Sequence, residues 1–133
     1  MFTPQAVSGG EITLTESVTK AQIGLPFTYK LQPMRPDYKG GQGTAMGSKV
    51  KINKAIVSYY ESLNSKYTDG TSDIAQPDWR TTEVYGTAPA LFTGEKDTVV
   101  NLGIDADNMF TIEGSDPLPC TVRSIVFKYS VMG

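Results

Sequence analysis

The sequence predicts an all-β fold, an antiparallel sandwich or barrel-like domain of about seven or eight strands with one long glycine-rich loop. Thirteen glycines and eight prolines accompany many Thr, Ser, Val and Tyr residues in a chain of 133 residues. Glycine and proline mark tight turns, whereas β-branched and aromatic residues favour strands. Short segments that alternate apolar and polar residues recur between these turn signals, and no segment shows a convincing helical period.

The first half of the chain begins with two predicted strands. A chain of this length fits one domain, and we expect residues 1–10 to form a lead-in segment and residues 11–133 a single all-β domain. Residues 11–15 alternate apolar and polar side chains, as a half-buried strand does. Residues 23–31 are apolar at alternate positions, and Pro26 on the opposite face indicates an edge strand or a bulge, because proline has no N–H for a central ladder.

A long connection and a long strand follow. Residues 33–47 are rich in glycine, and loops of this length inside a compact domain are commonly functional or mobile. The longest strand signal starts near Val50 and could extend to Tyr67. We expect it to be covered on both faces, because apolar residues occupy both: Val50, Ile52 and Ile56 with Ser58 on one, and Ala55, Val57 and Tyr59 on the other.

The second half of the chain predicts a meander of short strands. Strands are expected at residues 79–85, 98–104 and 109–113, with an apolar segment at 90–92 and turns at 94–97, 105–108 and 114–117. The last strand is the clearest, because apolar and polar residues alternate through it, with Ile125, Phe127, Tyr129 and Val131 on the apolar face.

Several kinds of chemistry are disfavoured by composition. Histidine is absent, which removes Ser-His and Cys-His catalysis and most zinc sites. Cys120 has no second cysteine to bridge, and we expect a small buried side chain there. The acids are scattered mainly over turns and single out no glycosidase pair. We therefore expect a protein that is not an enzyme, with no catalytic residue, cofactor or metal.

Binding to nucleic acid or to membranes is also not expected. The formal charge is −2, with both signs mixed along the chain, and this gives no attraction to phosphate backbones or anionic lipid. No apolar run is long enough to span a bilayer, and the first residues lack the pattern of a signal peptide.

Three short motifs fail when their context is examined. The glycine loop at residues 41–49 has the wrong spacing for a phosphate cradle and leads into a strand rather than a helix. Residues 105–108 match the first ligands of a calcium loop, but Met109 and Phe110 occupy the positions of a further ligand and the required glycine. Residues 17–20 match S-x-x-K without the helix start or companion motifs of that chemistry.

Aromatic residues give an alternative function. Trp79 is a possible aromatic contact, and with neighbouring tyrosines it could form a sugar-stacking platform in a carbohydrate-binding β-sandwich module of a virion or cell-surface protein. Aromatic residues on alternating strands are more often part of a core or an interface. The tyrosines in question are Tyr59, Tyr60, Tyr67 and Tyr85.

Five segments in order resemble the C-terminal region of the tail tubular, or nozzle, proteins of short-tailed bacteriophages. They are GGEITL at 9–14, IGLPF at 23–27, GQGT followed by GSK at 41–49, LFTGE at 91–95 and DPLPCTV at 116–122. Each segment alone is short, and the order makes the resemblance specific. It covers nearly the whole chain from about Val7 onward, and because members of that family are several times longer, we expect this chain to be an excised domain or a shortened relative.

The resemblance implies a structural role. It implies a β-rich subunit that forms a homo-oligomeric ring in the full-length protein, contacts other tail proteins, and lets genomic DNA pass without specific binding. It also implies no enzymatic activity, no cofactor and no membrane partner, and a location in the virion tail after synthesis in the host cytoplasm. We expect the contacts to involve a mobile loop that is too polar for a core, made of Lys39, Gly40, Gly41, Gln42, Gly43 and Thr44.

Overall fold

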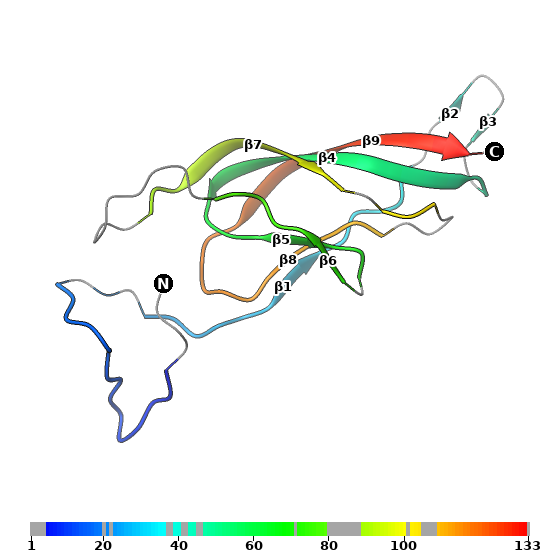
Figure 1. Ribbon diagram of the computed structural model, residues 1–133. Helices are drawn as coiled ribbons and strands as arrows, with labels where there is room; N and C mark the ends of the chain where they lie inside the picture. Colours follow the sequence, from blue (N-terminus) through cyan, green and yellow to red (C-terminus); the bar gives the residue numbers. More distant parts are fainter. Residues whose placement is uncertain are drawn as a thin grey trace.

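The chain folds into two antiparallel sheets that enclose one core, with a separate small hairpin at one end (Figure 1). The computed structural model describes residues 5–19, 21, 23–36, 39–40, 43–44, 47–70, 72–79, 89–100, 102–104 and 109–132. Within these ranges there are nine strands and no helix. Seven of the strands make up the two larger sheets. The prediction of an all-β fold is confirmed, and the arrangement is that of a sandwich.

The first sheet has three strands with the longest one at its centre. β4 (Lys49–Ser62) lies between β7 (Phe92–Val99) and β9 (Thr121–Met132), and both neighbours run antiparallel to it. Ala55 of β4 lies opposite Thr98 of β7 and Phe127 of β9, which fixes the register across the sheet.

The second sheet has four short strands in the order β1-β8-β5-β6. β1 (Tyr29–Leu31) lies at its edge, which confirms the edge position indicated by Pro26, although the strand is shorter than predicted. The remaining members are β8 (Thr111–Gly114), β5 (Lys66–Thr68) and β6 (Asp73–Ala75). The hairpin consists of β2 (Lys39–Gly40) and β3 (Gly43–Thr44).

A bulge in β4 decides which of its side chains enter the core. The pairing with β9 shifts register between Ile52 and Lys54, and Asn53 is the extra residue. Such a bulge restores the facing of the following residues, so Ile52 and Ala55 are both buried although they are three positions apart. The prediction that Ile52 and Ala55 lie on opposite faces is therefore wrong. The buried apolar side chains of β4 all face the second sheet: Val50, Ile52, Ala55, Val57 and Tyr59.

The predicted strand from Val50 to Tyr67 is two strands in different sheets. β4 ends at Ser62 and β5 starts at Lys66, and the residues between them cross from one sheet to the other. Asn64 has φ 124°, a conformation that L residues rarely adopt. The side-chain amide nitrogen of Asn64 donates a hydrogen bond to the Asp116 carboxylate. The backbone carbonyl oxygen of Asn64 accepts a hydrogen bond of 2.6 Å from the Tyr29 hydroxyl. Apolar residues continue to alternate through this corner, so the sequence pattern does not reveal the break between β4 and β5.

The last strand confirms its prediction except at Val131, which was placed on the apolar face and is 44% exposed. Ile125, Phe127 and Tyr129 are half-buried and pack against the core. A second register shift, between Ser58 and Tyr59 of β4, lets Val122 pack against the core as well. Such a shift has the same effect on β9 as the Asn53 bulge has on β4.

Other predicted elements differ from the structure. Residues 11–15 contain no strand, and Glu11 makes only an isolated bridge to Ser8. The predicted turn at 94–97 lies inside β7, and of the described residues in the predicted strand 98–104 only Thr98 and Val99 belong to a strand, because β7 ends at Val99. The polar run was misleading because β7 is an edge strand that exposes every second side chain. From the predicted strand 79–85 only Trp79 is described, outside any strand, and the turn at 105–108 lies outside the described residues.

Candidate functional site

The predicted contact loop contains the hairpin of β2 and β3. Lys39 pairs with Thr44 and Gly40 with Gly43, and the hairpin projects beyond the end of the three-stranded sheet, near the end of β9 (Figure 1). Gly41 and Gln42 lie outside the described residues. The loop expected to be a mobile contact element therefore contains strand pairing, and its role in contacts stays a prediction.

The base of this connection is closed by a hydrogen bond. The Arg35 guanidinium donates to the carbonyl oxygen of Ser48 at 2.8 Å, which joins the segment after β1 to the residue before β4. Gly47 has φ 90°, a value that glycine adopts at little cost. The hairpin thus extends from a fixed base.

Trp79 packs as part of the core. Its indole N–H donates to the carbonyl oxygen of Ser65 at 3.2 Å. Its ring meets that of Tyr59 edge-on with centroids 4.8 Å apart, and that of Phe92 at 6.1 Å. The ammonium group of Lys96 lies 4.1 Å from the centroid of the Phe92 ring and 5.7 Å from that of Trp79. These contacts hold the indole half-buried at one side of the sandwich.

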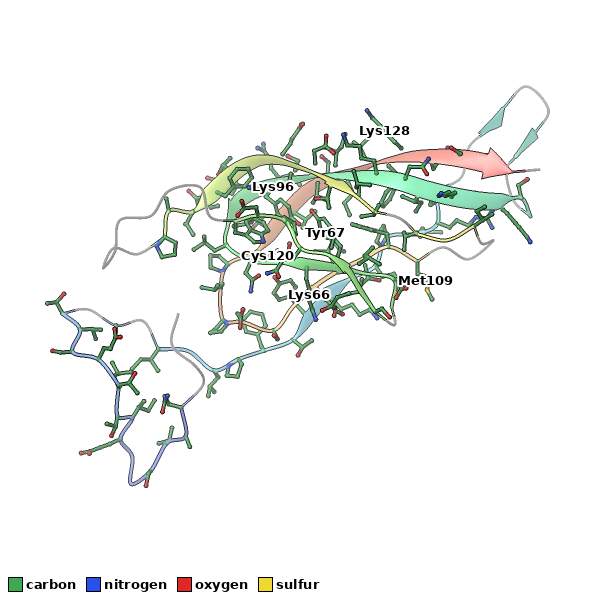
Figure 2. All side chains as sticks on the ribbon, viewed as in Figure 1. Lys66, Tyr67, Lys96, Met109, Cys120 and Lys128 are labelled. Atoms are coloured by element: carbon green, nitrogen blue, oxygen red, sulfur yellow. The ribbon has the colours of Figure 1, made fainter. Side chains whose placement is uncertain are left out.

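The tyrosines near Trp79 in the sequence do not join it in one exposed platform. Tyr59 and Tyr67 are fully buried, and Figure 2 shows Tyr67 between the two sheets. Tyr60 is exposed, with the Arg123 guanidinium 5.8 Å from its ring centroid. Tyr85 lies outside the described residues. The core reading of these aromatic side chains, which the sequence had favoured, describes Tyr59 and Tyr67.

Sequence reasoning missed a buried network of hydroxyl groups. The Tyr59 hydroxyl lies 2.7 Å from the Ser65 hydroxyl and donates to that of Tyr67 at 3.2 Å. Burial raises the pKa of both tyrosines above the ordinary value. No spacing rule links these residues, because they meet only after the chain turns from β4 into β5. The network supplies buried hydrogen bonds that form only when Tyr59, Ser65 and Tyr67 are arranged in this way.

Cys120 lies at the entrance to β9, half-buried against the core. Burial raises the pKa of its thiol, and a hydrogen bond with the Tyr29 hydroxyl acts in the opposite direction. A thiol becomes a good nucleophile when its pKa is lowered. The surroundings of Cys120 favour the protonated thiol.

The acidic side chains that form ion pairs do so on strands. Lys66 bridges Asp73 at 3.1 Å and Glu113 at 3.3 Å, which ties three strands of the four-stranded sheet together. Lys54 pairs with Asp97 across β4 and β7 at 2.5 Å. Over the described part of the chain, no three His, Cys, Asp or Glu side chains gather where one metal ion could bind them.

The motifs rejected from the sequence lie only partly within the described residues. Residues 17–19 are exposed and not helical, and Lys20 lies outside the described residues. The calcium-like turn at 105–108 is also outside them. In the described ranges, no helix is long and apolar enough to cross a membrane.

Comparison with known proteins identifies no relative. No protein-family model matches the chain, and no curated protein matches it significantly in sequence.

Proposed function

We propose that this chain is a structural component of the tail tube or nozzle of a short-tailed bacteriophage, and that it acts through protein–protein contacts in virion assembly. The observation that carries the proposal is the ordered set of five segments that resemble the C-terminal region of nozzle proteins. In this role the chain has no catalytic residue and no cofactor. Its partners are further copies of itself and other tail proteins, and DNA passes without specific binding.

The location of the five segments supports a contact role. The central strand β4 and the buried strand β8 contribute little to the resemblance. Among the matching residues that the structure describes, 23–27 are exposed, Gly43 and Thr44 form β3 and 92–95 lie in the edge strand β7, whereas Phe92, Cys120 and Val122 also pack against the core. Exposed segments and strand edges are where proteins meet partners.

The carbohydrate-binding alternative needs an open aromatic surface. Trp79 is packed against Tyr59 and Phe92, so no specific observation favours it. A shift in Trp79 fluorescence on addition of glycans would argue for this alternative against the tail role.

The test is to locate the protein in virions. An antibody against the chain, applied with gold label to purified particles of the phage whose genome encodes it, should mark the distal part of the tail. Label on the capsid, or particles without the protein, would contradict the proposal. A protein from the same lysate that is absent from particles provides the background level.

A further inference from the structure

The N-terminal arm, residues 5–28, carries an apolar stripe whose side chains are largely exposed. Ile23, Leu25 and Phe27 occupy alternate positions and are 68%, 86% and 55% exposed. Their alternation continues into β1, where Tyr29 on the same face enters the sandwich and donates to the Asn64 carbonyl oxygen. The arm thus extends the inward face of an edge strand past the end of the core.

The side of the arm opposite the apolar stripe lies close to the sandwich. A Cβ at Gly24 would lie 3.1 Å from the Cβ of Pro117, so the backbone of the arm passes close to the connection between β8 and β9. Ile23 and Leu25, which flank Gly24, stay exposed. Burying such side chains is favourable, and the arm of an isolated chain does not do so.

The outer face of the three-stranded sheet carries a second apolar patch. Ile56 of β4 lies directly opposite Val126 of β9, and Val99 of β7 lies opposite the neighbouring outward position of β4, Lys54. Val99 is 73% exposed and Val126 is 53% exposed. This patch faces away from the core.

Two lysines lie beside the patch on the same outer face, and an acidic residue balances their charge only on the β7 side. Lys54 lies directly opposite Lys128, and like charges facing each other across two strands are destabilising. Asp97 pairs with Lys54 from the β7 side, whereas β9 contains Arg123 and Lys128 and no acidic residue. Figure 2 shows Lys128 pointing away from the sandwich. An acidic partner on this side would relieve the repulsion.

The arm has the complementary composition. Across residues 5–28 the formal charge is −1, from Glu11 and Glu16, both exposed, against Lys20. An extended chain rises about 3.3 Å per residue, so Glu16 reaches at most about 25 Å from Ile23. On the sheet, Lys128 lies about 7 Å from Val126 along β9. The apolar and acidic parts of one arm could therefore engage the patch and the lysines together.

We propose that the N-terminal arm of one copy packs across the outer face of the three-stranded sheet of a second copy, with its apolar stripe on Val99 and Val126 and its glutamates toward Lys128. A second copy is the occupant because the arm and the outer face lie on opposite sides of one molecule (Figure 1). The contact rests on the proposed function only in that both require self-association. The proposed contact also specifies which two surfaces of the copies meet.

The test is sedimentation velocity of the whole chain over a range of concentrations. Leu25→Asp on the arm and Val126→Asp on the outer face should each raise the dissociation constant at least about tenfold, because each places a carboxylate in an apolar contact. Met34→Asp is the matched control, since Met34 is 92% exposed and belongs to neither surface. Circular dichroism checks that each variant is folded.

Charge reversal provides a second test of the same contact. Glu16→Lys should weaken association, and adding Lys128→Glu should restore most of it, because the pair then has opposite charges again. Lys30→Glu, on an exposed residue of β1 away from the outer face, replaces Lys128→Glu in the control double variant and should restore nothing.

Two results would overturn the inference. One is a wild-type chain that stays monomeric at every concentration. The other is association of Leu25→Asp and Val126→Asp that matches Met34→Asp, in which case a ring built through other surfaces still stands. Failure of the proposed function is recognised separately, by the absence of the protein from virion tails.

Discussion

At the residue scale, Tyr29 occupies the space that a side chain at position 114 would need, so only glycine fits there. The two residues are directly opposite each other in β8 and β1, and a Cβ at Gly114 would overlap the ring and hydroxyl of Tyr29. The same hydroxyl bonds Asn64 at the corner between the sheets. A single glycine thus lets one aromatic side chain connect the edge strand to the corner.

Gly114→Ala should lower the free energy of unfolding by about 1–3 kcal/mol, the usual cost of overpacking. Gly103→Ala is the control, because a Cβ there meets nothing within 4 Å. Chemical denaturation of both variants measures the difference. Equal stability of the two would show that Tyr29 moves aside at little cost.

Removing one hydroxyl tests the buried network. Tyr59→Phe should lower the free energy of unfolding by about 1–2 kcal/mol, because the Ser65 and Tyr67 hydroxyls lose a buried partner. Tyr60→Phe is the matched control on the next residue, which is exposed, and should change little. Thermal and denaturant unfolding measure both. A Tyr59→Phe variant as stable as Tyr60→Phe would show that the network contributes nothing.

Buried tyrosines also make stability depend on alkaline pH. Burial raises the pKa of Tyr29, Tyr59 and Tyr67 in the folded chain, whereas the unfolded value is about 10. The unfolded chain therefore releases protons first, so this stabilisation is complete below about pH 10 and is lost as pH rises above it. Tyrosinate absorbance and circular dichroism, followed together, should change in one transition. Ionisation of these tyrosines without unfolding would contradict the assignment.

At the element scale, the hairpin of β2 and β3 is the part most open to removal. Its strands pair only with each other in the described structure, and the Arg35–Ser48 hydrogen bond closes its base. Deleting residues 39–43 should leave the free energy of unfolding nearly unchanged while weakening assembly. Thermal unfolding and sedimentation measure the two effects. Loss of the folded state would refute the assignment of this loop as a contact element.

The sequence predicted strands where alternation is regular and failed where register shifts. The alternation of Ile125, Phe127 and Tyr129 predicted β9 correctly. Asn53 was not recognised as a bulge, because only pairing with β9 reveals the extra residue, and so the faces of β4 were assigned wrongly. The polar residues of β7 read as a turn because an edge strand exposes half of its side chains.

The candidate site was less predictable than the fold. The hydroxyl network joins Tyr59, Ser65 and Tyr67 across a corner that no local pattern marks. Trp79 was identified as a notable aromatic, but its packing against Tyr59 depends on how the chain returns after β6. Contacts between segments distant in sequence follow from topology, which the composition of single segments does not specify.

At the scale of the whole molecule, the sandwich encloses one core, and the proposed contact elements lie at the surface. The core lies between β4 and the four-stranded sheet. The arm extends from one end of the sandwich and the hairpin from the other (Figure 1). Such a division suits a subunit whose task is assembly, because contacts can form without disturbing the core.

Negative-stain electron microscopy of the purified protein tests the central claim most directly. The account predicts closed rings or short tubes in which every subunit contacts two neighbours, as a homo-oligomeric tail component requires. Particles that remain single subunits at all concentrations, with no ring or tube, would contradict it.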